Sequence, residues 1–92
     1  MDRCTHIEAR LRAELVATHV AVEDESHLHA GHAGAAAGGG HFRVAIVSER
    51  FAGLSLVARQ RLVYGALAAE MKGEIHALAM RTFTPEEWAA ER

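Results

Sequence analysis

Apolar positions at the start of the chain recur with helical spacing. Three of them are four residues apart, with charged side chains between them: Ile7, Leu11 and Leu15. This spacing predicts an amphipathic helix over about residues 4–18 with one buried stripe. Thr5 and Glu8 have the spacing of a capping box, whose side chains bond to free backbone N–H groups, so we expect them to begin this helix.

Three other segments alternate between apolar and other residues with the period of two that is typical of β-strands. Residues 19–26 (HVAVEDES) alternate at Val20 and Val22. Residues 41–48 (HFRVAIVS) place Phe42, Val44 and Ile46 on one side. Residues 74–82 (EIHALAMRT) follow the same pattern, and strict alternation puts His76 on the side of Leu78 and Met80.

Two further helices complete the pattern. Ser55 is a suitable N-cap for a helix that runs to about Lys72, and Gly73 is well placed to end it. The expected apolar stripe of this helix is Leu62, Val63, Ala66, Leu67 and Met71. Thr84, Pro85 and Glu87 have the spacing of a capped first turn, so they predict a last short helix that Trp88 anchors to the body of the protein.

The predicted order is therefore helix, strand, strand, helix, strand, helix. Consecutive strands favour an antiparallel pair, whereas a strand that follows a helical crossover favours parallel pairing with a right-handed connection. The sequence thus predicts a single compact α+β domain over residues 1–92, a three-stranded mixed sheet covered on one face by helices. Residues 27–40 form the connection between the first two strands, and their glycines predict a flexible loop.

This topology gathers histidines that are far apart in the chain. The loop and the residue after it carry four of the seven histidines, His27, His29, His32 and His41. The end of the first strand and the starts of the other two should meet at one sheet edge, so we expect these histidines to lie near His76. Neutral imidazole binds metals near neutral pH. The alternatives are solvated loop histidines, a His76 that lies at the rim of the core, or a simple Zn or Ni site.

Composition narrows the function. The net charge of −2 and the predicted pI of 6.4 argue against a dedicated nucleic-acid binder. A single cysteine allows no internal disulfide, and the chain shows no signal peptide or membrane-length apolar run, so we expect a cytoplasmic protein. No nucleophile-elbow or phosphate-binding sequence occurs, and we expect no catalytic residues and no enzymatic activity. Arg59 and Arg61 form either a solvated charged face or a docking patch for an acidic or phosphate-bearing partner.

Four segments together resemble the BolA family over almost the whole chain. They are DESHLHAGHAG, HFRVAIVSERFAG, RQRLVYGAL and IHALAMRTFTPEEW. The resemblance implies a fold similar to class II KH domains. It also implies a non-enzymatic partner of a monothiol glutaredoxin, in iron–sulfur cluster trafficking or iron sensing, that is a monomer or weak homodimer when alone. Such partners share a [2Fe-2S] cluster to which glutaredoxin and glutathione contribute thiolates.

The same resemblance implies the ligand residues. His76 matches the family's carboxy-terminal histidine, His29 matches a loop position that is His or Cys in the family, and His41 matches a frequent histidine at the start of the second strand. The chain has Gln60 where family members often have histidine between two arginines, which leaves the flanking Arg59 and Arg61 as the only cations of that motif.

The alternative that the resemblance implies is a DNA-binding transcriptional regulator with a KH-like surface. Its contact residues would be Arg43, Arg59 and Arg61. The acidic pI weighs against strong binding, although a local basic patch on an acidic protein remains compatible with it.

Overall fold

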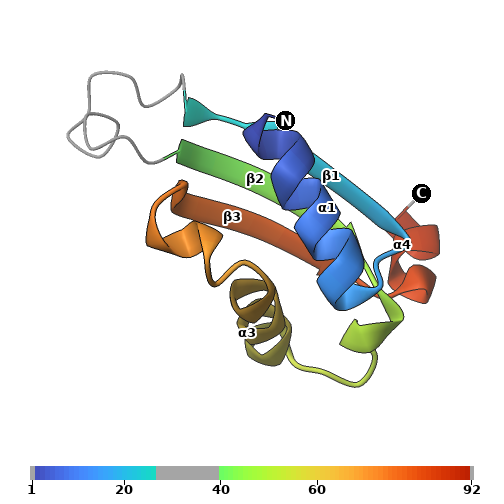
Figure 1. The fold of residues 1–92 in the computed structure, drawn as a ribbon. Coiled ribbons are helices and arrows are strands. Elements are labelled where there is room, and N and C mark those ends of the chain that lie inside the picture. The colour runs from blue at the N-terminus through green and yellow to red at the C-terminus, as the bar shows by residue number, and fades with distance from the viewer. Residues whose placement is uncertain (1, 27–39, 92) are drawn as a thin grey trace.

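A three-stranded sheet runs through the protein, and two helices cover one of its faces (Figure 1). The structure is a computed structural model that describes residues 2–26 and 40–91. The elements are α1 (Arg3–Leu15), β1 (His19–Asp24), β2 (Gly40–Val47), η2 (Glu49–Phe51), α3 (Leu56–Ala66), η3 (Glu70–Lys72), β3 (Ile75–Phe83) and α4 (Pro85–Glu91). The predicted order of helices and strands is confirmed, with two short 3-10 turns added.

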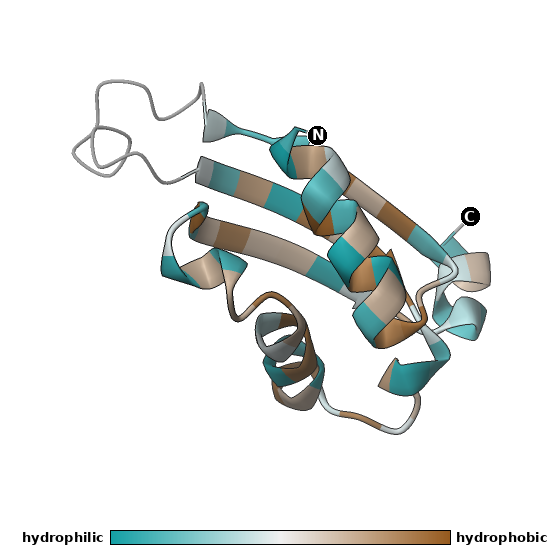
Figure 2. Ribbon diagram, viewed as in Figure 1, coloured by the Kyte–Doolittle hydropathy of each residue, from teal (hydrophilic) through white to brown (hydrophobic). Residues whose placement is uncertain are grey.

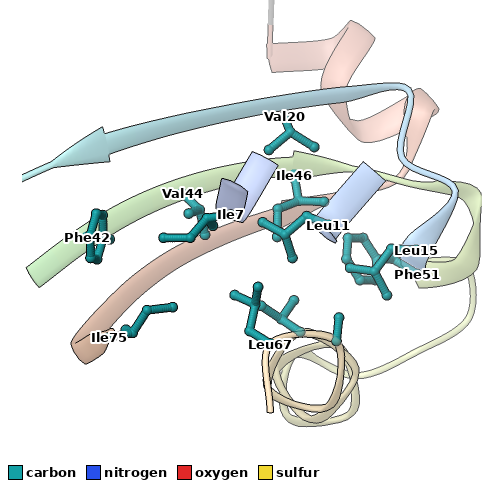
Figure 3. Packing of buried hydrophobic residues seen from close by; sticks show 12 residues of the cluster. Ile7, Leu11, Leu15, Val20, Phe42, Val44, Ile46, Phe51, Leu67 and Ile75 are labelled. Atoms are coloured by element: carbon teal, nitrogen blue, oxygen red, sulfur yellow. The ribbon is translucent and has the colours of Figure 1, made fainter. Parts of the chain in front are cut away.

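The pairing of the strands is also as predicted. The sheet order is β1-β2-β3, with β1 antiparallel to β2 and β2 parallel to β3. Phe42, Val44 and Ile46 of β2 are buried toward α1 and α3, where they form one core with the apolar stripe of α1. Figure 3 shows Ile7 and Leu11 of this stripe beside Val44 and Ile46. The side of the sheet away from α1 and α3 is called the open face below.

Helix α1 buries the predicted stripe, but its cap differs from the prediction. Ile7, Leu11 and Leu15 are at most 3% exposed, and Figure 2 shows hydrophilic and hydrophobic residues interleaved along the helix. The capping residue is Asp2, whose Oδ1 accepts a hydrogen bond from the Thr5 N–H at 2.8 Å. The predicted box of Thr5 and Glu8 is wrong because Thr5 already lies inside the helix. Glu8 instead accepts a hydrogen bond from Arg12 Nε at 2.9 Å.

Helix α3 begins at the predicted cap and ends earlier than predicted. The Ser55 hydroxyl accepts a hydrogen bond from the Ala58 N–H, but the helix stops at Ala66 and residues 70–72 form a separate turn. This turn buries Glu70, whose Oε2 lies 2.7 Å from His6 Nε2 on α1. Burial alone would raise the pKa of Glu70, but the hydrogen bond from His6, then a backbone hydrogen bond at Glu70 itself and the charges of His6 and Arg10, together lower the pKa. A buried carboxylate thus fixes the turn that interrupts the predicted helix.

The predicted apolar stripe of this segment is confirmed only in part. Val63, Ala66 and Leu67 are buried, and Met71 packs partly buried against the core. Leu62 is 37% exposed, because the buried face of α3 is formed by Arg59, Val63 and Ala66 and Leu62 lies beside that face.

Helix α4 has the predicted capping box and the predicted anchor. The Glu87 N–H donates to the Thr84 hydroxyl, and Glu87 Oε1 accepts from the Thr84 N–H at 2.8 Å. The Trp88 ring stacks on His19 with centroids 4.9 Å apart and lies 5.2 Å from the Phe83 ring. His19 and Phe83 flank Val47 in the sheet register, so α4 covers one end of the open face.

Arg59 joins α3 to α4 from inside the protein. It is 7% exposed, and its guanidinium donates two hydrogen bonds to the Glu87 carboxylate at 2.7 and 3.2 Å and others to the carbonyls of Leu54 and Thr82. The sequence interpretation of Arg59 as part of a solvated face or a docking patch is therefore wrong. Its partner lies 28 residues further along the chain, so spacing within the helix could not reveal the burial.

The Arg59–Glu87 ion pair predicts an acid-sensitive attachment of α4. The hydrogen bonds from Arg59 lower the pKa of Glu87 from 4.5 to about 2. A carboxylate whose pKa is lower in the folded state than in the unfolded state stabilises the folded state at every pH above its unfolded-state pKa. This contribution is lost as the pH falls through the folded-state pKa. We therefore expect the fluorescence of Trp88, the one tryptophan in the sequence, to change between pH 4.5 and about 2.

Glu87→Gln should remove this transition, because the variant carries no titratable group at that position. Glu86→Gln, on the neighbouring exposed residue, is the matched control and should retain it. The same acid transition in both variants and in the unmodified protein would contradict this account of α4.

Candidate functional site

One edge of the sheet gathers the end of β1 and the starts of β2 and β3, as the predicted topology requires (Figure 1). Backbone groups tie the three strands together there. The Gly40 N–H donates to the Glu74 carbonyl at 3.0 Å, and the Glu25 N–H donates to the His41 carbonyl at 2.7 Å. The His41 N–H in turn donates to the Ser26 hydroxyl at 3.0 Å. The described residues on either side of segment 27–39 are therefore fixed to the sheet.

A β-bulge lies at this edge and changes the direction of the third strand's side chains. Gly40 is paired with Ile75, but the next residue, His41, is paired with Ala77. His76 is therefore the extra residue of β3, which no residue of β2 opposes. Bulges of this kind break the alternation of side chains and are common beside functional sites because they re-aim one side chain.

The bulge brings two imidazoles together. The rings of His41 and His76 have centroids 5.2 Å apart and planes inclined by 47°. His76 is exposed, and His41 is half-buried. These two residues are called the imidazole pair below. The prediction that His76 lies on the side of Leu78 and Met80 is wrong, because Ile75, Leu78 and Met80 face the core and the bulge shifts His76 out of step with them.

The other predicted ligands have different outcomes. His29 lies outside the described residues, as do His27 and His32. In the part of the chain that the structure describes, no group of three or more histidine, cysteine or acidic side chains could hold a metal ion. The imidazole pair is thus the part of the predicted site that the structure shows.

The imidazole pair fits an incomplete coordination site for a metal centre. A [2Fe-2S] cluster takes four ligands, most often thiolates and in some centres two imidazoles. The single thiol, Cys4, lies on α1 beside Asp24. Burial, followed by the charges of Asp24 and Asp2, raises the pKa of Cys4, which disfavours the thiolate that binds metal. Among the described residues, the imidazoles are therefore better suited than Cys4 to bind such a cluster, and the remaining ligands would have to come from another molecule or another part of the chain.

At Gly40 the backbone packs so closely against the side chains of Phe42 and Arg3 that there is no space for a Cβ atom. A Cβ atom added to Gly40 would lie 2.5 Å from Phe42 Cε2 and 2.7 Å from Arg3 Nη1. Arg3 also reaches the Glu74 carbonyl, which already accepts the Gly40 N–H. This role is hidden in the sequence because Gly40 ends a run of glycines that is typical of a loop. Its position directly before a strand was the available signal.

The three predicted arginine contacts do not share a surface. Arg43 lies on the open face, 52% exposed, with its Nε 3.2 Å from Glu25 Oε2. Arg61 is exposed on α3, which covers the opposite face of the sheet, and Arg59 is buried. A single basic patch built from all three is therefore excluded by the fold.

Comparison with known proteins identifies the family. A model described as BolA-like protein matches residues 11–87. The chain belongs to the BolA family. The DNA-binding transcriptional regulator BolA of Vibrio cholerae is 46% identical over 82 residues, which cover 89% of this chain and 74% of that protein. BolA-like protein 1 of Mus musculus is 45% identical over 83 residues, 89% of this chain and 61% of that protein.

Solved structures agree with this assignment and with the α+β fold. The BolA domain of SufE1 from Arabidopsis thaliana is 42% identical to this BolA-family chain, with a TM-score of 0.81, and the match covers 95% of this chain and 96% of that one. No helix in the described part of the chain is long and apolar enough to cross a membrane.

The close approach at Gly40 gives a stability prediction. Gly40→Ala should lower the free energy of unfolding by about 1–3 kcal/mol, because the buried Phe42 ring has to move to admit the new methyl group. Gly65→Ala is the control. No atom lies within 4 Å of the added Cβ there, and alanine in a helix is more favourable than glycine by about 0.5–1 kcal/mol. Urea unfolding measures both; equal stability of Gly40→Ala and the unmodified protein would contradict the steric argument.

Proposed function

We propose that this BolA-family protein is a non-enzymatic partner of a monothiol glutaredoxin and co-ligates a bridging [2Fe-2S] cluster through histidine. The observation that supports this most directly is the imidazole pair, held at the sheet edge from which segment 27–39 departs. His76 is the first ligand of the proposal, His29 within that segment is the second, and His41 is the third candidate.

The chemistry of imidazole suits such a role. A neutral ring offers one nitrogen lone pair to a metal, and protonation withdraws it, so binding through histidine is sensitive to pH. Imidazole in place of thiolate also raises the reduction potential of a [2Fe-2S] centre. A site with these ligands releases or senses a cluster more readily than one built from thiolates alone, which fits trafficking or sensing in iron homeostasis.

The partner supplies what this chain lacks. The sequence has one thiol, so the chain alone provides too few thiolates for a typical [2Fe-2S] site. A glutaredoxin cysteine and glutathione would provide the remaining thiolates. Anaerobic reconstitution with and without a monothiol glutaredoxin, followed by absorption spectra and mass, distinguishes this shared cluster from a simple Zn or Ni site on the chain alone.

Replacing the exposed member of the imidazole pair tests the proposal. His76→Ala should shorten the lifetime of the cluster in the heterocomplex by at least about tenfold, because a metal ligand is lost. The fold should persist, because His76 is exposed and outside the core. Visible circular dichroism after reconstitution reports the cluster, and far-ultraviolet circular dichroism reports the fold.

The matched control is His19→Ala, a histidine that stacks on Trp88 at the far end of the sheet. It should leave the visible spectrum and the lifetime of the cluster unchanged. An unchanged visible spectrum and cluster lifetime for His76→Ala would count against His76 as a ligand.

A second candidate function is DNA binding, because bacterial relatives carry the name DNA-binding transcriptional regulator. Arg43 and Arg61 are the exposed candidates, while Arg59 is committed to Glu87. Binding through phosphates would weaken steeply with salt, and removing one contact should lower the slope of log affinity against log salt by about one. DNA affinity measured against salt concentration for Arg43→Gln and Arg61→Gln gives this slope. If the unmodified protein binds no DNA even at low salt, DNA binding is ruled out as a function.

A further inference from the structure

Next to the imidazole pair, the open face of the sheet has two successive cross-strand rows made mostly of exposed residues. The register places Ala21, Ala45 and Arg81 side by side in one row and Glu23, Arg43 and Ala79 in the next. No large apolar side chain belongs to either row. Beyond the first row, Trp88 of α4 covers His19 and Phe83, so the two rows lie between α4 and the imidazole pair.

The imidazole pair adjoins this same face. Phe42 is buried in the core, so alternation along β2 puts His41 on the open face, in the same line as Arg43 and Ala45. The other face is filled by α1 and α3, as Figure 1 shows. His76 is exposed, whereas the Nε2 atom of the half-buried His41 is itself buried, so a protein that approaches over the open face meets His76 first. On the other side of the sheet, α1 and α3 block the approach.

The shape and charge of the open face define the partner surface that fits it. Three strands about 4.8 Å apart make an area about 10 Å wide, and the alanines allow a backbone to approach closely. The ion pairs Arg43–Glu25 and Arg81–Glu91 neutralise both guanidinium groups. Glu23, directly opposite Arg43 in the register, then gives these rows one net negative charge. A partner surface with basic residues would therefore complement the charge of the open face.

We propose that the glutaredoxin docks over the open face, with a basic patch facing Glu23 and its cluster-binding edge against the imidazole pair. This inference rests on the proposed function and adds the surface to it. It assigns α1 and α3 to the side of the protein that stays outside the complex. It also makes the alanines of β2 and β3 on this face contact residues, where a larger side chain would prevent the partner from docking.

A bulky substitution on the open face, beside Arg43 of the central strand, tests this docking surface. Ala79→Tyr adds a ring on an exposed strand position, where tyrosine is favourable for β-structure. It should weaken binding of monothiol glutaredoxin without cluster by about tenfold or more, as steric blocks at the centre of an interface do. Ala13→Tyr, on an exposed position of α1, is the matched control and should bind as the unmodified protein does.

Isothermal titration of both variants, with far-ultraviolet circular dichroism to confirm folding, separates the outcomes. Wild-type affinity for folded Ala79→Tyr, or weakened binding for Ala13→Tyr instead, would overturn the docking surface while leaving the glutaredoxin partnership in place. No binding by the unmodified protein, with or without cluster, would overturn both proposals.

A charge reversal tests the electrostatic part. Glu23→Arg should weaken binding most at low salt, because the partner's basic patch would then meet a cation. Tighter binding of Glu23→Arg would show that the partner presents an acidic surface and would contradict the proposed orientation.

Discussion

The parallel pairing of β2 with β3, and the one extra residue within it, is the constraint on which the rest of the structure depends. The Glu74 carbonyl accepts the Gly40 N–H, which fixes Gly40 opposite Ile75. The next pair already joins His41 to Ala77, so His76 has to leave the ladder. A strand without this bulge would keep His76 in step with Leu78 and Met80, on the core side, and the two imidazoles would be on opposite faces of the sheet.

The two faces of the sheet then take different roles. One face carries the core, in which residues of α1, α3 and the inner side of the strands are buried together. Among the described residues, the other face is covered at one end, where Trp88 packs on His19 and Phe83 and the Arg59–Glu87 ion pair holds α4. The buried contacts of the described residues thus lie on the helical side and around α4, and the rows between α4 and the imidazole pair are the surface to which we assign the partner.

The sequence predicted much of this from local patterns and missed what depends on distant contacts. The periodicity of apolar residues and the helix-capping residues predicted the order of the elements, the mixed sheet, the Ser55 cap and the Thr84–Glu87 capping box. These features depend on residues only a few positions apart. The burial of Arg59, the turn fixed by Glu70 and His6, and the close contact at Gly40 depend on partners far along the chain. Topology alone predicted that His41 and His76 lie at the same end of the sheet. The bulge that brings their rings together has no signature in a strictly alternating strand.

The contact between the two imidazoles tests the central claim most directly. Nuclear Overhauser effects between the ring protons of His41 and His76 should be observed in the protein without metal or partner, because the ring centroids are 5.2 Å apart. Cross-peaks from the His76 ring to the side chains of Leu78 and Met80, with none to His41, would show an unbulged strand and contradict the account.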